Sequence, residues 1–88
     1  MISKTQREFW HCFNALPDAI QRLAKERFRL WEKDNFNPAL HFKPLLGNVW
    51  SVRVNQKYRA LGRRTGNLVV WFWIGAHEEY NQLKRRLR

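Results

Sequence analysis

The chain of 88 residues carries 17 lysines and arginines against 7 acidic residues, a formal net charge of +10. This length is typical of one domain, which we assign to residues 1–88. Because 44% of the residues are hydrophobic and 15% are aromatic, the chain has enough apolar surface to fold, which excludes an intrinsically disordered protein. A single cysteine, Cys12, excludes an internal disulfide and favours the cytoplasm. No apolar run approaches the roughly 20 residues of a membrane helix.

Two helices are predicted in the first half of the chain. Thr5 and Glu8 have the spacing of a capping box, and apolar residues then recur with helical spacing. Pro17 breaks this helix and suits the first turn of the next one, whose apolar stripe extends to Trp31. The segment Asn-Phe-Asn-Pro at 35–38 ends the second helix. The pattern predicts an antiparallel helical hairpin whose apolar faces pack on a sheet.

Two predicted strands, residues 49–54 and 58–62, form a hairpin whose register depends on the loop length. A two-residue loop mixes polar and apolar side chains on each face. A three-residue loop pairs Val54 with Tyr58 and Arg53 with Arg59, and it gathers the apolar side chains on one face. We predict the second register because it satisfies burial, and it makes the two arginines neighbours.

The remaining elements are a loop at residues 63–67, a strand at 68–74 and a helix at 77–87. The strand is continuously apolar, which is typical of a central strand covered on both faces. The helix has acidic residues in its first turn and basic residues near its end, the arrangement that the helix dipole favours. The predicted class is α+β: a two-helix hairpin packed on a twisted antiparallel sheet of three to four strands, with a short C-terminal helix.

The acidic residues are absent between Asp34 and Glu78, while basic residues continue through that section. Its positive potential is not offset locally, which favours polyanionic partners: nucleic acid first, an acidic protein second and an anionic membrane third. A solvated basic surface is the simpler alternative. We expect the excess charge to form one face. The expected contacts to nucleic acid are Lys43, Lys57, Arg63, Arg64, Lys84 and Arg85.

Four residues form the candidate catalytic set: Arg53, Arg59, His77 and Tyr80. Arg53 and Arg59 are neighbours in the predicted register, and like charges placed opposite each other destabilise a sheet unless an anion or solvent relieves them. His77 follows the last strand, and Tyr80 lies one helical turn later. These residue types suffice for metal-free RNA cleavage, which needs two proton transfers and charge stabilisation at the phosphate. A structural role for His77 as a helix cap and for Tyr80 as a packing residue remains open.

Metal or cofactor chemistry has little support in the sequence. His11, His41 and His77 lack ligand spacing, and Cys12 has no partner cysteine. There is no glycine-rich phosphate loop. We expect no metal and no cofactor, and we interpret Cys12 as a small buried apolar residue.

Six short segments occur in order along nearly the whole chain: Ala15 to Gln21, Leu40 to Lys43, Trp50 to Val54, Tyr58 to Leu61, Trp71 to Gly75, and His77 to Tyr80. Together they resemble the RelE/ParE superfamily, the toxins of bacterial type II toxin–antitoxin systems. The resemblance implies two helices on an antiparallel sheet. It also implies a metal-independent, ribosome-associated mRNA endoribonuclease that inhibits translation in the cytoplasm. The implied partners are mRNA, the ribosome and a cognate antitoxin with an acidic segment, in a toxin–antitoxin hetero-oligomer.

The resemblance places the candidate residues at functional positions of the family. Arg53 lies where a family strand carries a functional basic residue, and Arg59 matches the arginine of the family's Tyr-Arg strand. His77 matches the histidine or basic position after the last strand, and Tyr80 matches a C-terminal tyrosine to within a few residues. Ser51 stands where some ribonuclease members have a second lysine.

Two further features of the resemblance bear on the sheet and on the partner. Residues 1–4 alone precede the first helix, so the N-terminal strand that family members usually have is expected to be very short or missing. The antitoxin is expected to lie across the surface that lacks acidic residues.

Two other functions remain open at this point. The ParE branch of the superfamily inhibits DNA gyrase and lacks the ribonuclease residues, so a toxin that acts by binding alone is one alternative. A non-toxic basic nucleic-acid-binding module is the other.

Overall fold

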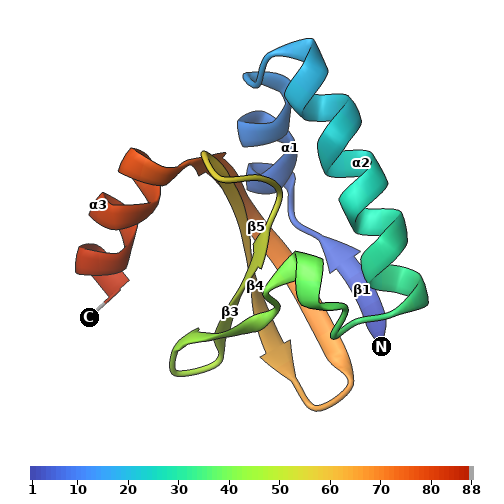
Figure 1. The fold of residues 1–88 in the computed structure, drawn as a ribbon. Helices are drawn as coiled ribbons and strands as arrows, with labels where there is room; N and C mark the ends of the chain where they lie inside the picture. The colour runs from blue at the N-terminus through green and yellow to red at the C-terminus, as the bar shows by residue number, and fades with distance from the viewer. Residues whose placement is uncertain (88) are drawn as a thin grey trace.

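Five strands form one twisted sheet in the order β1-β5-β4-β3-β2, with α1 and α2 on one face and α3 at the other (Figure 1). The computed structural model describes residues 1–87 and the side chains of residues 1–86. The strands are β1 Ile2–Thr5, β2 Lys43–Leu46, β3 Val49–Arg53, β4 Tyr58–Thr65 and β5 Leu68–Ala76. The helices are α1 Arg7–Asn14, α2 Asp18–Lys33 and α3 His77–Leu87, with a 3₁₀ turn at Pro38–Leu40. The predicted α+β class is confirmed.

The sheet is larger than predicted and is not wholly antiparallel. Five strands replace the expected three to four, because the edge strand β2 was not predicted and β1 was expected to be very short or missing. β1 runs parallel to β5, with Ile2 opposite Leu68 and Thr5 opposite Trp71. β2 pairs antiparallel with β3, and its Pro44 is tolerated because an edge strand leaves one side of its backbone unpaired. The N-terminal strand is therefore present, although it is short.

The β3–β4 hairpin has the predicted register. Val52 lies opposite Ala60 and Arg53 opposite Arg59, and the amide of Val54 donates to the carbonyl of Tyr58 at 3.0 Å. The Asn55 side chain closes the loop, since its Oδ1 accepts from the amides of residues 57 and 58 at 2.8 and 2.9 Å. This turn fixes which side chains share a face, and hence it fixes the arginine pair.

Two local predictions were wrong. The first helix has no capping box: Thr5 belongs to β1, its hydroxyl accepts from Trp10 Nε1 at 3.0 Å, and the residue before α1 is Gln6. The predicted loop at 63–67 is mostly strand, because β4 continues to Thr65 and the turn contracts around Gly66 at φ 58°. Long arginine side chains are compatible with a strand when their charged ends reach solvent.

The main core lies between the sheet and the α1–α2 side. Trp31 from α2 is 1% exposed, and its ring packs edge-to-face against Phe42 and Trp71 at 5.7 and 5.4 Å between centroids. A smaller cluster on the other face joins Val49 and Leu61 of the sheet to Tyr80 of α3. These two clusters anchor the helices to opposite faces. Among the described residues, no helix has the length and apolarity to span a membrane.

Gly62 is a point of close packing, and its substitution tests the registration of β4 on β5. A Cβ atom at this position would lie 2.7 Å from Val69 Cγ1 and 2.8 Å from Trp71 Cε3, both in the core. Gly62→Ala is therefore expected to lower the free energy of unfolding by about 1–3 kcal/mol through overpacking. Urea unfolding measures this. The matched control is Gly66→Asn, because the left-handed backbone there suits asparagine and open space surrounds the site. Equal losses of stability in the two variants would contradict the proposed close packing at Gly62.

Candidate functional site

Two rows of side chains cross the sheet face opposite α1 and α2. Residues directly opposite each other in paired strands project from the same face, so one row consists of Arg53, Arg59 and Gly75. The adjacent row, set by the same pairings, consists of Lys43, Ser51, Leu61 and Trp73. α3 packs on β4 and β5 at one end of this face. The structure therefore places the predicted arginine pair beside the C-terminal helix.

Tyr80 connects Arg59 to His77. The guanidinium carbon of Arg59 lies 5.4 Å from the Tyr80 ring centroid, a cation–π contact. The His77 ring stacks on the same tyrosine at 5.8 Å and an interplanar angle of 19°. Three of the four candidate catalytic residues thus form one contiguous group. Because Tyr80 is 9% exposed and packs with Val49 and Leu61, it also holds α3 on the sheet.

Arg59 has spare hydrogen-bonding capacity. Its Nε is buried and has no hydrogen-bond partner among the side chains that the structure describes. An unsatisfied buried donor costs about 1–3 kcal/mol, more when it is charged. The guanidinium also carries a full positive charge, and an anion bound at its outer nitrogens would offset that charge, which gives this arginine a physical reason to accept a phosphate.

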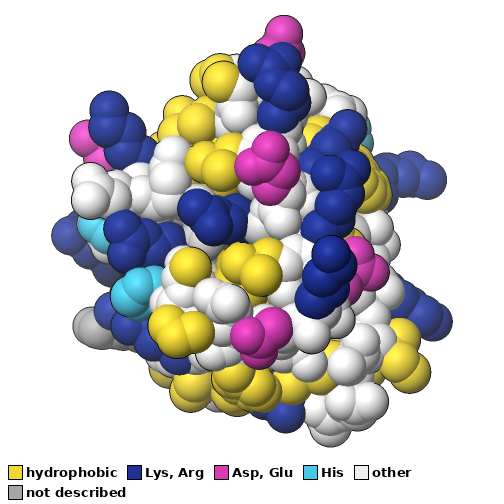
Figure 2. Space-filling model, turned by 45° about the vertical axis from the view of Figure 1, so that its right-hand side comes forward, with side chains coloured by type: hydrophobic (Ala, Val, Ile, Leu, Met, Phe, Trp, Pro, Cys, Tyr) yellow, Lys and Arg dark blue, Asp and Glu magenta, His cyan; other side chains and the backbone are white. Residues whose placement is uncertain are grey.

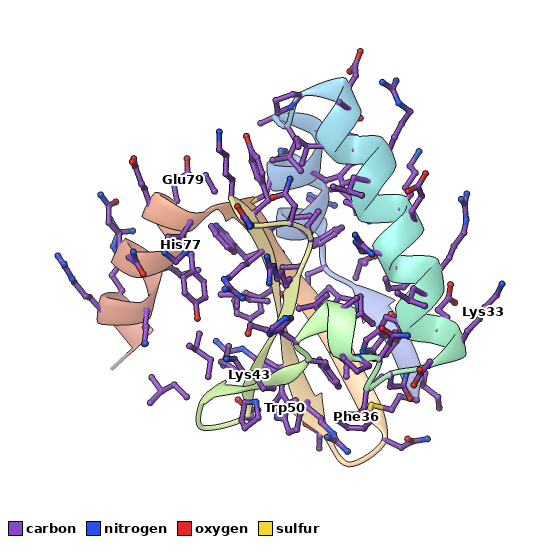
Figure 3. The ribbon with its side chains drawn as sticks, viewed as in Figure 1. Lys33, Phe36, Lys43, Trp50, His77 and Glu79 are labelled. Atoms are coloured by element: carbon purple, nitrogen blue, oxygen red, sulfur yellow. The ribbon has the colours of Figure 1, made fainter. Side chains whose placement is uncertain are left out.

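Backbone geometry fixes the start of α3. The amide of His77 donates to the carbonyl of Lys57 at 2.6 Å, so the helix begins against the β3–β4 loop. Gly75 allows close packing at the end of β5, since a Cβ atom there would lie 2.6 Å from Trp73 Cζ2 and 2.9 Å from Glu79 Oε2. Figure 3 shows His77 and Glu79 together on the first turn of α3. The imidazole is therefore positioned by a rigid strand end.

Arg53 contacts a residue that was not predicted for the site. Its Nη1 lies 3.2 Å from Nε2 of His41, which precedes β2 and adopts a left-handed backbone at φ 46°. Spacing within the sequence does not reveal this contact, because the turn after Pro38–Leu40 creates it. One signal was available: Leu40 and Phe42 are apolar and buried while His41 is exposed, an alternation that directs His41 away from the core.

The predicted nucleic-acid contacts divide between surfaces. Lys43 lies in the second row and Lys57 in the β3–β4 loop, and both are exposed. Arg63 is exposed on the same face, 5.0 Å above the Phe72 ring. Arg64 projects to the opposite face, where its guanidinium lies 4.5 Å from the Trp50 ring centroid. The remaining two, Lys84 and Arg85, occupy the last turn of α3.

We had expected the excess positive charge to form one face of the molecule. The structure instead places basic side chains on a second face as well. Figure 2 shows lysine and arginine side chains running along the helix-bearing side, with acidic side chains between them. Figure 3 places Lys33, at the end of α2, on the side away from His77 and Lys43. Sequence reasoning missed this second basic surface. It follows from helical spacing, and its exposed members on α2 are Arg22, Lys25, Arg29 and Lys33.

The chemistry available on the α3 face is phosphate binding and proton transfer. Two guanidinium groups supply permanent positive charge and N–H donors, and imidazole transfers protons near neutral pH. Within the part of the chain that the structure describes, no group of three or more histidine, cysteine, aspartate or glutamate side chains is placed to hold a metal ion.

Comparison with protein families identifies one match. A family model described as a ParE-like toxin domain matches residues 18–82, which include α2, β2 to β5 and most of α3. A comparison with curated proteins found no match.

Several solved structures share the fold. The RelB–RelE antitoxin–toxin complex from Methanococcus jannaschii matches with a TM-score of 0.74 at 14% identity, covering 91% of this chain and 96% of that one. YafQ from Escherichia coli strain BL21(DE3) matches with a TM-score of 0.71 at 11% identity, covering 89% and 94%. The YoeB/ParE toxin from Agrobacterium tumefaciens matches with a TM-score of 0.67 at 19% identity, covering 88% and 99%. At these identities the likeness concerns the fold.

Proposed function

The chain belongs to the ParE-like toxin domain family of the RelE/ParE superfamily, and from that premise we propose that this toxin of a toxin–antitoxin system cleaves mRNA on the ribosome without a metal ion. The observation that carries the proposal is the contiguous group Arg59, Tyr80 and His77, beside Arg53 on the same sheet face. A toxin that acts by binding alone needs a basic surface. It does not need an imidazole beside an arginine pair.

The reaction that suits this face is attack by a ribose 2′-hydroxyl on the adjacent phosphorus. Arg53 and Arg59 bind the phosphate and stabilise the charge that develops on its oxygens. His77 transfers a proton to or from the reacting oxygens. Tyr80 orients His77 through the ring stack and holds Arg59 through the cation–π contact. The fixed start of α3 keeps the imidazole in place while the RNA binds.

The proposed partners follow from charge and from the solved relatives. The toxin from Methanococcus jannaschii was solved with its RelB antitoxin, and a complex named RelBE2 is known from Mycobacterium tuberculosis. For this chain we propose an antitoxin whose acidic segment covers Lys43, Arg53 and Arg59, together with ribosome-bound mRNA as the substrate. Both partners would neutralise the same guanidinium groups, so they would exclude each other.

His77→Gln tests the proposed ribonuclease activity. Glutamine keeps a polar side chain of similar length and removes the transferable proton, so the cleavage rate is expected to fall about 10²-fold. Expression in cells followed by primer extension on a reporter mRNA detects new 5′ ends. The matched control is His11→Gln, which changes an exposed histidine on α1 and is expected to cleave like the wild type. Growth arrest without new mRNA ends, equally severe with His77→Gln, would show that the protein is not a ribonuclease.

A binding-only toxin is the second candidate, because the burial of Tyr80 gives this residue a role that does not depend on catalysis. A tyrosine that is 9% exposed within the cluster of Val49 and Leu61 serves packing whether or not RNA is cleaved. DNA supercoiling assays with gyrase separate the two functions, because a gyrase inhibitor changes plasmid topology while mRNA stays intact.

A further inference from the structure

We propose that His41 is a second catalytic residue of the candidate ribonuclease, acting as the general base opposite His77. The inference rests on the proposed function and deepens it. It starts from the 3.2 Å contact between His41 Nε2 and Arg53 Nη1 on the α3 face.

RNA cleavage of this kind needs two groups that transfer protons. RNA cleavage by the 2′-hydroxyl moves two protons: one leaves the nucleophile and one reaches the departing 5′-oxygen. The group formed by Arg59, Tyr80 and His77 contains one imidazole, the side-chain type most used for proton transfer in catalysis. A single imidazole in that group leaves one of the two transfers without a partner. A second such side chain on the same face would complete the set.

The contact with Arg53 determines which role Nε2 of His41 takes in the hydrogen bond. Arginine remains protonated in proteins and its guanidinium nitrogens only donate hydrogen bonds. In the contact with Arg53, Nε2 of His41 must therefore accept, which requires the neutral form with a lone pair at that atom. A neutral imidazole with its lone pair directed at the phosphate-binding arginine is the form that a general base needs.

His41 and His77 lie on either side of the arginine pair. His41 contacts Arg53, Arg53 is paired with Arg59 across β3 and β4, and Arg59 contacts Tyr80, on which His77 stacks. The two histidines therefore lie at opposite ends of one series of residues on this face, with the register-paired arginines between them. An in-line reaction needs this order, because the nucleophile and the leaving oxygen lie on opposite sides of phosphorus.

The proposed reaction transfers two protons and replaces one bond to phosphorus by another. Phosphate binding draws the Arg53 guanidinium onto its oxygens and frees Nε2 of His41. That nitrogen takes the proton of the 2′-hydroxyl as the 2′-oxygen bonds to phosphorus. The bond from phosphorus to the 5′-oxygen breaks, and protonated His77 gives its proton to that oxygen. The products are a 2′,3′-cyclic phosphate and a 5′-hydroxyl, and exchange with water resets both imidazoles.

The backbone of His41 determines which variants are informative. At φ 46° most side chains are strained, but asparagine and glycine tolerate this region well. His41→Asn offers a carbonyl oxygen that can accept from Arg53, yet it cannot take up a proton. His41→Gly removes the side chain and leaves space for added imidazole. Because His41 is exposed, both variants are expected to keep the wild-type unfolding midpoint.

The decisive experiment compares two substrates on ribosomes programmed with a short mRNA. One carries the natural linkage, and the other carries sulfur in place of the 5′-oxygen at the cut site, because a thiolate leaves without needing a proton. On the natural linkage, His41→Asn and His77→Gln are each expected to lose about 10²-fold, and His11→Gln to lose nothing. On the sulfur linkage His77→Gln is expected to recover, whereas His41→Asn remains slow. Added imidazole is expected to restore cleavage by His41→Gly.

The outcomes separate the inference from the proposed function. If the wild type cuts neither substrate, the ribonuclease function fails and the role of His41 fails with it. If the wild type cuts the natural linkage and His41→Asn cuts it at the same rate, the role of His41 is wrong while the ribonuclease function stands. Recovery of His41→Asn on the sulfur linkage would also overturn the assignment, since it would make His41 the acid.

Discussion

Arg59→Ala is expected to lower the rate of mRNA cleavage by about 10³-fold, the size of loss typical when a charged group that stabilises a phosphoryl transition state is removed. Arg59 is central to the candidate site: it is paired with Arg53 across the hairpin and contacts Tyr80, on which His77 stacks. Its loss would remove phosphate charge stabilisation and the cation–π contact that holds Tyr80. The effect should exceed that of removing either histidine, because water can replace part of a proton transfer but not a fixed guanidinium.

Single-turnover cleavage of ribosome-bound mRNA, with the variant in excess, measures this loss without a contribution from product release. Arg59→Lys is expected to fall between the wild type and alanine, because lysine keeps the charge but lacks the planar fork of donors. Arg29→Ala, which changes an exposed arginine on α2, serves as the charge-matched control. If Arg59→Ala and Arg29→Ala cleave at similar rates, the arginine pair is not where the phosphate is stabilised.

Trp31→Ala is expected to have the largest effect on stability, about 3–5 kcal/mol. The side chain is 1% exposed and contacts three aromatic rings: Phe28 on the same helix, Phe42 just before β2, and Trp71 on β5. It also lines an apolar pocket of about 250 Å³ between the helices and the sheet, so the truncation would enlarge space that the core already leaves unfilled. A domain of this size has little stability to spare, and the variant is expected to be largely unfolded at 37 °C.

Chemical unfolding followed by circular dichroism measures that loss. Trp31→Phe is expected to cost far less than alanine, because the ring packing is kept and the buried Nε1, which has no partner among the described residues, disappears. Trp10→Ala provides a matched truncation at a side chain that is 45% exposed. A loss for Trp31→Ala no larger than that for Trp10→Ala would show that the aromatic cluster does not dominate the stability.

Local patterns predicted the elements whose neighbours are close in sequence. The α3 helix begins at His77 as expected, because the strand before it is continuously apolar and ends at small residues. The hairpin register followed from burial alone, since one register in two segregates Val52 and Ala60 from the arginines. β2 was missed, and β1 was expected to be very short or missing, because their sequences, Lys-Pro-Leu-Leu and Ile-Ser-Lys-Thr, carry little alternation. Their pairing partners, rather than their own residues, make them strands.

The same distinction holds for the residues of the candidate site. Those on predicted elements could be placed from the sequence, whereas those that depend on an unpredicted turn or strand could not. Arg53, Arg59, His77 and Tyr80 were found from register, helical spacing and the family resemblance, and the structure brings Arg59, Tyr80 and His77 into contact. His41 was not found, because a left-handed residue after a 3₁₀ turn determines where its side chain lies. The projection of Arg64 to the opposite face was missed as well, since the segment was predicted as a loop and a loop has no alternation.

The parallel pairing of β1 with β5 sets an order of events when the chain is made. Ile2 pairs with Leu68 and Thr5 with Trp71, so the first strand to leave the ribosome must wait until most of the polypeptide has followed it. Contacts between such distant segments form late, because closing a long loop costs entropy before the pairing compensates for it. His77 is synthesised later still. A nascent chain therefore has neither a closed sheet nor a complete candidate site until nearly the whole polypeptide has been made.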